Sequence, residues 1–216
     1  MIIKGYNITL KRLVHEDIEM VRQWRNSQAV SRFMEIREEI TPLQQEEWFK
    51  KIDTIHNNYF LIIENHTPVG LIYGAEIDWE KGITGNGGIF LAQEQYFNSD
   101  IPIRATFLII DTGVLLGLKT QYVKVLNDNY RAKFFNKKLG YKLLQGEEKN
   151  YNQKYYLEAN HYLASAKALK KAMNFSESEL IEIVIDNPDH PVSKNIISTC
   201  QKKVNQEVNR LKLIFI

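Results

Sequence analysis

Cysteine is nearly absent from this sequence, since Cys200 is the only one among 216 residues. A single cysteine excludes an internal disulfide, and the five dispersed histidines provide neither a paired-cysteine zinc spacing nor a His-Glu-x-x-His run. We therefore expect no metal site and a reducing, cytoplasmic location. Cys200 lies close to Ile196, Ile197 and Val204 in a predicted amphipathic helix, which favours a role in the core.

Long hydrophobic runs and an excess of one charge are also lacking. The N-terminus has no apolar run of the signal-peptide kind, and the longest apolar stretch, FLIIDTGVLLGL, contains Asp111 and Thr112 and is too short to cross a bilayer. Lys plus Arg number 28 against 26 Asp plus Glu, and no basic stripe typical of nucleic-acid binding is present. The sequence thus predicts neither a membrane nor a nucleic acid as partner.

The residues that are present fit a folded protein, because 44% are hydrophobic and 25% are charged. The pattern changes after about Ser165, and we predict one domain over residues 1–165 and a C-terminal extension over residues 166–216. The extension is expected to contain a helix from Ala166 to Met173, the apolar run LIEIVI, a breaker NPDHP and a long helix from Val192 to Leu211.

The first part of the chain carries the clearest local signals. Alternating residues from Asn7 to Leu13 predict a strand, and apolar residues at every third position predict a helix up to Asn26. A second helix is expected to start at Thr41 as N-cap, with Pro42 in its first position and Gln44 closing a capping box.

The remaining elements of the domain follow from periodicity and turn residues. We expect a hairpin at 59–64 and 68–77, a turn-rich segment at 79–88, a strand at 89–91, a buried helix at 103–118, a strand at 122–126, a helix from about 129 to 138 that ends at Gly140, and strands near 141–144 and 155–157.

Two stretches carry a family resemblance. LKRLVHEDIEMVRQWRN, then Met34 and ITPLQQEEWF, resembles the N-terminal signature of one branch of the GNAT superfamily of N-acyltransferases, with Trp24 to Asn26 as its most specific element. This branch contains ribosomal-protein alanine acetyltransferases and nucleotide-amino-sugar acetyltransferases such as that of pseudaminic acid synthesis. NYRAKFFNKKLGYK, from Asn129 to Lys142, is similar to the superfamily's C-terminal motif. The resemblance covers roughly residues 7–160 and implies an α/β (α+β) fold with a mixed, mainly antiparallel sheet flanked by helices.

The resemblance also implies a function and a site. An acetyl group would pass from acetyl-CoA, the co-substrate, to a primary amine of an amino sugar or a protein by direct attack of the amine on the thioester. The residues that the resemblance implies for acetyl-CoA are Ile89, Phe90, Leu91, Ile103, Arg104, Asn129 and Asn136. Those implied for the amine acceptor are Trp24, Arg25 and Asn26. Glu76 and Asp78, at the end of a hairpin strand, are the candidate bases, acting directly or through water.

The sequence departs from the superfamily pattern at three places. Asp100 and Pro102 stand where glycines of the pyrophosphate loop are expected, and Arg104 is the residue that would compensate. Asn136 replaces the tyrosine that often protonates the CoA thiolate, and Tyr130 and Tyr141 are the alternative phenols. The frequent acidic residue of the central strand is also missing, because Asn86 takes its position.

These departures keep two alternatives open. One is a GNAT-fold module that has lost catalysis and serves binding or assembly. The other is an acyltransferase whose donor is the phosphopantetheine of a carrier protein, which needs no pyrophosphate loop. The apolar end LKLIFI adds a further open question, since the extension could pack on the core, cover the acceptor cleft or form a homodimer contact.

Overall fold

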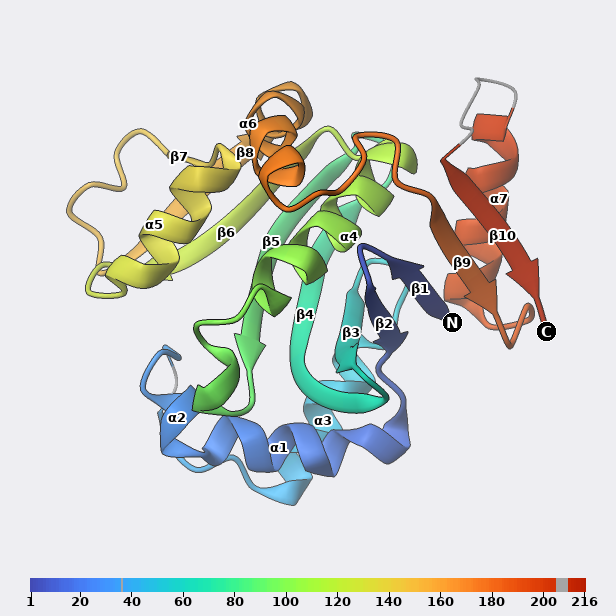
Figure 1. Ribbon diagram of the computed structural model, residues 1–216. Helices are drawn as coiled ribbons and strands as arrows, with labels where there is room; N and C mark the ends of the chain where they lie inside the picture. Colours follow the sequence, from blue (N-terminus) through green and yellow to red (C-terminus); the bar gives the residue numbers. More distant parts are fainter. Residues whose placement is uncertain (36, 205–209) are drawn as a thin grey trace.

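The computed structural model describes residues 1–35, 37–204 and 210–216, and its centre is a single mixed sheet (Figure 1). The ten strands follow the order β10-β9-β1-β2-β3-β4-β5-β6-β8-β7, and only the β5–β6 and β9–β10 pairs are parallel. The strands are β1 (Ile2–Gly5), β2 (Ile8–Arg12), β3 (Asn58–Glu64), β4 (Thr67–Asp78), β5 (Ile83–Leu91), β6 (Thr120–Leu126), β7 (Lys142–Leu143), β8 (Asn152–Glu158), β9 (Ile181–Ile185) and β10 (Leu211–Phe215). The predicted fold class, a mainly antiparallel mixed sheet flanked by helices, is confirmed.

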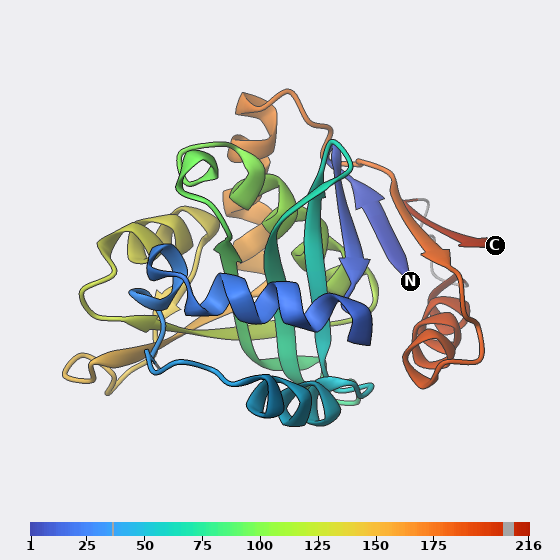
Figure 2. The same cartoon turned by 90° about the horizontal axis from the view of Figure 1, so that it is seen from below.

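Helices cover both faces of this sheet, as Figures 1 and 2 show for α4 on one face and α1 and α3 on the other. They are η1 (His15–Asp17), α1 (Ile18–Asn26), α2 (Gln28–Ser31), α3 (Pro42–Ile52), η2 (Glu94–Tyr96), α4 (Ile101–Leu115), α5 (Tyr130–Leu139), α6 (Ala159–Ala172) and α7 (Pro191–Val204). Within the described ranges, no helix is long and apolar enough to cross a membrane.

Alternation along β3 and β4 assigns side chains to two cores. Phe60, Ile62 and Ile72 join a large cluster with α4, whereas Leu61 and Leu71 face the opposite side and pack with α1. Successive side chains of a strand point to opposite faces, so both faces of this hairpin are apolar because both are covered by helices.

The local signals for helix ends are confirmed. The Thr41 hydroxyl accepts from the Gln44 amide at 3.2 Å, and the Gln44 side chain accepts from the Thr41 amide at 2.8 Å. Asn129 caps α5, and Gly140 follows that helix with φ of +98°, a left-handed conformation that glycine adopts without a steric cost.

Three expectations about elements are wrong, and one strand was not expected. Residues 2–5 form a strand that the sequence did not suggest, and the segment expected to be turn-rich is mostly β5, which begins at Ile83. The first helix of the extension begins at residue 159, so the expected boundary at 165 falls inside α6. The long helix expected to reach residue 211 ends earlier, since Leu211–Phe215 is β10; residues 205–209 of that expectation lie outside the described residues.

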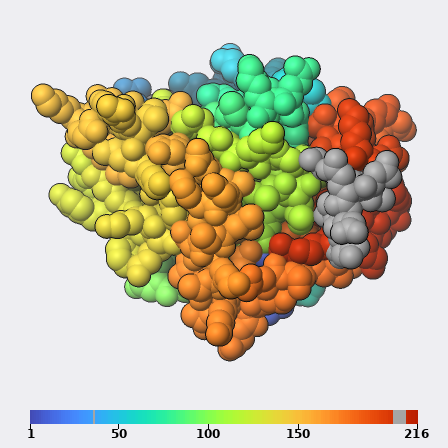
Figure 3. Space-filling model, turned by 90° about the horizontal axis from the view of Figure 1, so that it is seen from above, coloured from blue at the N-terminus to red at the C-terminus, as the bar shows by residue number. Residues whose placement is uncertain are grey.

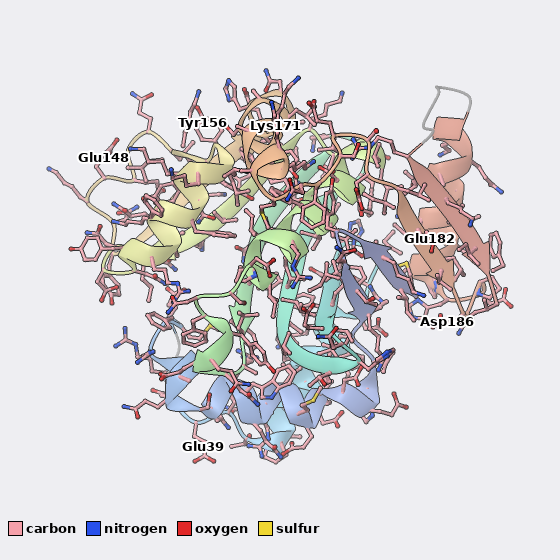
Figure 4. The ribbon with its side chains drawn as sticks, viewed as in Figure 1. Glu39, Glu148, Tyr156, Lys171, Glu182 and Asp186 are labelled. Atoms are coloured by element: carbon pink, nitrogen blue, oxygen red, sulfur yellow. The ribbon has the colours of Figure 1, made fainter. Side chains whose placement is uncertain are left out.

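The extension continues the central sheet. Strand β9 pairs antiparallel with β1 through Ile183 and Ile3, and β10 pairs parallel with β9. At the end of β9, Asp186, labelled in Figure 4, accepts from the N-terminal amine of Met1 at 2.6 Å. Figure 3 shows the orange atoms of α6 between the yellow region of α5 and the red C-terminal segment.

A buried carboxylate fastens α6 and the C-terminal segment to α4. Asp111, 2% exposed, accepts from Lys170 Nζ at 2.7 Å, from Tyr162 at 2.8 Å, from Arg210 at 2.8 Å and from Tyr6. Burial alone would raise the pKa of Asp111, but Lys170 and the two phenols outweigh it, and the pKa lies below its usual value. The Asp111 cluster therefore stabilises the fold above the pKa of an unfolded aspartate, and this contribution is lost as the pH falls through the lower folded value.

Replacing Lys170 by Met is expected to lower the free energy of unfolding by about 3 kcal/mol, because it removes one cation from a buried pair while Arg210 remains. The matched control is Lys171→Met, whose exposed side chain lies on the outside of α6 (Figure 4). Urea denaturation at pH 7 measures both variants. Equal stability of the two variants would contradict the structural role of the Asp111 cluster.

Candidate functional site

Strands β5 and β6 begin side by side and then separate. They pair only at Ile83 with Thr120 and at Thr84 with Gln121, whereas β4 accompanies β5 as far as Leu91. From Gly85 to Leu91, therefore, β5 has no strand partner on the β6 side, as the diverging ribbons in Figure 1 show. Backbone N–H and C=O groups along this edge are available to a ligand.

A backbone irregularity lies where the separation begins. Glu76 has φ of +55°, and it forms no ladder pair with Gly85, although its neighbours Ala75 and Ile77 are paired normally with β5. A Cβ atom at Gly85 would lie 2.8 Å from both Cβ and Oε2 of Glu76, so glycine is required there. Left-handed conformations of residues other than glycine are strained and gather at functional sites.

A cavity of about 1030 Å³ includes the space between the separating strands and extends to Met1, Ile183 and Ile196. One wall is the unpaired part of β5, and the opposite wall is formed by β6 and α5. Residues at the start of α4 and residues of α1 and α3 also line it. The residues used below that line it are Arg25, Glu35, Trp48, Tyr59, Tyr73, Asn86, Gly88, Ile89, Phe90, Leu91, Phe97, Ile103, Asn129, Arg131, Asn136 and Lys138.

Most residues predicted for the acyl donor meet in this cavity. Six of the seven line it, namely Ile89, Phe90, Leu91, Ile103, Asn129 and Asn136. The Asn129 side chain is also the cap of α5, because its Oδ1 accepts from the Ala132 amide at 3.0 Å. Asn86 lies in the same wall as Ile89, on the unpaired part of β5.

The seventh, Arg104, lies apart from the cavity lining. Its guanidinium donates to Glu64 at 2.8 and 3.1 Å, to Asp100 at 3.0 Å and to the carbonyl of Asn7 at 2.6 Å. Only 8% of the Arg104 side chain is exposed. Its role toward a phosphate remains a prediction, and it would require the guanidinium to leave these partners.

The first turn of α4 offers few free amides. Ile101 N donates to Ser99 Oγ at 3.3 Å, Pro102 has no N–H, and Arg104 N donates to the carbonyl of Asp100. Only the amide of Ile103 has no intramolecular acceptor in this turn. A helix start binds anions through several such amides, so this one is a weak anion site, and the half-exposed carboxylate of Asp100 weakens it further.

Cations line the cavity from α5 instead. Arg131 and Lys138 are seven residues apart, so they share a helix face, whereas Lys133 and Lys137 are not part of the lining. The Arg131 guanidinium carbon is 5.6 Å from the ring centroid of Phe97, in the segment just before α4. The seven-residue spacing of Arg131 and Lys138 was visible in the sequence, but the sequence analysis did not use it to predict site residues.

The residues predicted for the acceptor have different surroundings. Trp24 packs edge-on against Phe90 with 6.5 Å between ring centroids, and Arg25 lines the cavity. Asn26 donates to and accepts from the backbone of Ile40, both at 2.9 Å, which fixes the segment before α3. The structure therefore brings Arg25 to the cavity and engages Asn26 in a backbone clamp.

Arg25 lies in an aromatic corner of the cavity. Its guanidinium carbon is 5.3 Å from the ring centroid of Trp48, and Tyr59 and Tyr73 stack beside it with centroids 4.7 Å apart. Burial lowers the pKa of Arg25 and raises the pKa of both tyrosines. At neutral pH the corner thus presents one cation and two protonated phenols.

Gly88 makes room for this corner. A Cβ atom there would lie 2.8 Å from the hydroxyl and the ring of Tyr73, its cross-strand partner. The sequence reasoning missed Trp48, Tyr59 and Tyr73 as site residues. The available signal was the cross-strand position of the two tyrosines in the expected hairpin.

Glu76 and Asp78 are outside the cavity lining. Asp78 accepts from the Lys81 ammonium at 2.8 Å and from the Lys81 amide at 3.0 Å, and these bonds lower its pKa. Such hydrogen bonds between Asp78 and Lys81 are typical of a carboxylate that stabilises a turn. Glu76 is exposed, and its strained backbone places it beside the start of the unpaired edge. The catalytic role of either carboxylate remains a prediction.

Among the described residues, no group of three or more His, Cys, Asp or Glu side chains is placed to hold a metal ion.

Comparison with known proteins identifies the family. The acetyltransferase (GNAT) domain family matches residues 7–142. A comparison with curated proteins gives no significant match.

Solved structures share the fold at low sequence identity. Spermidine N-acetyltransferase from Vibrio cholerae, in complex with CoA and spermine, has a TM-score of 0.62 at 18% identity, over 73% of this chain and 98% of its own. FdhC, a nucleotide-linked sugar GNAT, has a TM-score of 0.63 at 17% identity, over 81% of this chain and 97% of its own. Aminoglycoside acetyltransferase AAC(6')-Ib in complex with coenzyme A has a TM-score of 0.62 at 14% identity, over 74% of this chain and 99% of its own.

Arg104→Gln is expected to lower the free energy of unfolding by about 2–4 kcal/mol, because it leaves Glu64 and the Asn7 carbonyl without their donor. Arg131→Gln is the matched control, since the Arg131 side chain is exposed and forms no ion pair in the described chain. Chemical denaturation of the two variants measures the difference. An Arg104 variant as stable as the control would argue against its structural role.

Proposed function

Because the chain belongs to the GNAT acetyltransferase family, we propose that it transfers an acetyl group from acetyl-CoA to a primary amine. The observation that carries this proposal is the unpaired edge of β5 from Gly85 to Leu91, which faces the cavity. The pantetheine arm of the donor is an extended chain with two amides. It binds along this edge as an added strand would, through the backbone of Ile89 to Leu91.

The donor's phosphates are held from α5 rather than from the start of α4. Arg131 and Lys138 line the cavity, and the contact of Arg131 with Phe97 brings a guanidinium across to the segment that precedes α4. The first turn of α4 contributes little, because Pro102 lacks an N–H and Asp100 repels an anion. Asn129 and Asn136 lie on the same face of α5 and contact the arm between these cations and the thioester.

The reaction requires an unprotonated amine at the thioester carbon. The new bond joins the amine nitrogen to that carbon, the carbon–sulfur bond breaks, and the proton lost by the amine balances the proton gained by the departing thiolate. Glu76 is the proposed base and acts through water, since it lies beside the start of the unpaired edge and outside the cavity lining. Asn136 supplies no proton, because an amide does not ionise at neutral pH.

The acceptor binds at the end of the cavity next to α1 and α3. Its amine belongs to an amino sugar or to a protein or peptide, and Arg25 forms part of its pocket, with Trp24 packed behind the lining residue Phe90. The acceptor thereby approaches β5 from the face opposite to α4, where the donor's phosphates lie.

A second candidate is favoured by the first turn of α4. Its single free amide and the engaged Arg104 also suit a chain that does not bind CoA. Such a chain would be a binding or assembly module with a homodimer contact through the extension, or an enzyme whose acyl donor is a carrier protein. Binding of acetyl-CoA separates this candidate from the first.

Calorimetric titration tests the donor site with three proteins and two ligands. Wild-type protein is expected to bind acetyl-CoA, and Arg131→Gln to raise its Kd by about 10- to 100-fold, the effect of one lost charge-assisted hydrogen bond. Binding of S-acetylpantetheine, which has no phosphate, should not change. Lys137→Gln, an exposed residue of α5 outside the lining, is the control.

Absence of binding to either ligand by wild-type protein would refute the acetyl-CoA site. An equal effect of the Arg131 and Lys137 variants would refute the assignment of the phosphates to the cavity face of α5.

Glu76→Gln is expected to lower kcat by about 100-fold with KM unchanged, because a general base contributes roughly two to four orders of magnitude. Turnover is measured as CoA release with the best amine from a panel of amino sugars and peptides. Glu80→Gln is the control, since Glu80 is an exposed carboxylate of the adjacent turn. The same loss in Asp78→Asn, with Glu76→Gln unaffected, would transfer the role to the other predicted base.

A further inference from the structure

The Arg25 side chain is half-buried, and its guanidinium has no acceptor among the described residues. It forms neither a hydrogen bond nor an ion pair with them, and the guanidinium carbon lies 5.3 Å from the centroid of the Trp48 ring. A cation removed from water without a carboxylate is costly, because the ring restores only part of its lost hydration. Two neighbouring arginines are paired instead, Arg22 with Glu19 and Arg32 with Glu94.

The groups around Arg25 are also donors. The hydroxyls of Tyr59 and Tyr73 line the same corner, and neither donates to an acceptor of the described chain. Raised pKa values keep both phenols protonated at neutral pH. The corner therefore combines five guanidinium N–H donors and two hydroxyls, and none of them donates to an acceptor of the described chain.

Carboxylates are nearly absent from the lining. Glu35 is the one acidic residue among the described lining residues, and it is exposed and accepts from the Asn152 amide at 2.8 Å. Glu76 is near enough to raise the pKa of both tyrosines, but its side chain does not line the cavity. A polycationic amine such as a polyamine would meet Arg25 with no compensating negative charge.

We propose that the acceptor amine carries an anionic group, a phosphate or a carboxylate, which Arg25, Tyr59 and Tyr73 bind in this corner. This inference rests on the proposed function, because it concerns the second substrate of the same cavity. The anion is fixed by the arginine fork and the two phenols, while the Trp48 and Tyr59 rings supply apolar contact for the rest of the acceptor. The amine then points from the corner toward Gly88 and the thioester beyond it.

The test uses protein saturated with desulfo-CoA, which fills the donor site without reacting. Calorimetric titrations compare two matched pairs of amines, glucosamine 1-phosphate with glucosamine and glycine with glycinamide, and add spermidine as the polycation. At least one anionic member is expected to bind 10-fold or more tightly than its neutral counterpart, and spermidine is expected not to bind. The pair that shows the difference identifies the anion as phosphate or carboxylate.

Variants test whether the preference for the anionic amine depends on Arg25 and Tyr59. Arg25→Gln is expected to abolish the difference within the pair, a change of about 10- to 100-fold. Tyr59→Phe removes only a hydroxyl and should reduce the difference severalfold, so the inference stays testable if the Arg25 variant folds poorly. Arg32→Gln, an exposed arginine outside the lining, is the control and should keep the full preference.

The outcomes separate two failures. No binding of desulfo-CoA would overturn the proposed function together with this inference. Binding of desulfo-CoA with equal or undetectable binding of both members of each pair would overturn only the inference, as would tight binding of spermidine or an unchanged preference in both the Arg25 and Tyr59 variants.

Discussion

Two residue pairs hold β5 against β6, and the loss of pairing beyond Thr84 is the constraint on which the site depends. Next to Thr84 along β5, the left-handed backbone of Glu76 interrupts the β4–β5 ladder opposite Gly85. A side chain at Gly85 would not fit there. Separation of the strands leaves backbone donors and acceptors unpaired inside the molecule. Unpaired backbone groups inside a protein cost free energy unless a ligand or water forms hydrogen bonds with them. The separation of the strands therefore creates a binding site.

The two ends of the cavity have different electrostatics. At the start of α4 the arginine that would receive a phosphate is engaged by Glu64 and Asp100, and it serves to fix the helix. Positive charge toward the cavity comes from Arg131 and Lys138 of α5, from Lys124 of β6 and from Arg25 of α1. On the far side of α4, the Asp111 cluster ties the helix to the C-terminal extension. The basic side chains of the lining therefore outnumber the one acidic side chain among its described residues, Glu35.

Local chemistry made much of the fold predictable. Thr41, Pro42 and Gln44 define a helix start within a few residues, and alternation around Phe60 and Ile72 defines a hairpin. Strand β10 was not predictable, because Leu211 to Phe215 has no turn signal of its own and becomes a strand only by pairing with β9. The resemblance pointed to most of the donor wall and to Arg25. It could not reveal that Arg104 is engaged or that Trp48 packs on Tyr59, since those contacts join segments far apart in the chain.

Amide hydrogen exchange of the wild-type protein with and without acetyl-CoA tests the central claim most directly. The account predicts that amides between Gly85 and Leu91 become protected on addition of acetyl-CoA, because the pantetheine arm pairs with the edge of β5 that β6 leaves free. Strand β10, at the far edge of the sheet and with no residue in the cavity lining, should exchange at an unchanged rate. Saturating acetyl-CoA without any protection at residues 85–91 would contradict the account.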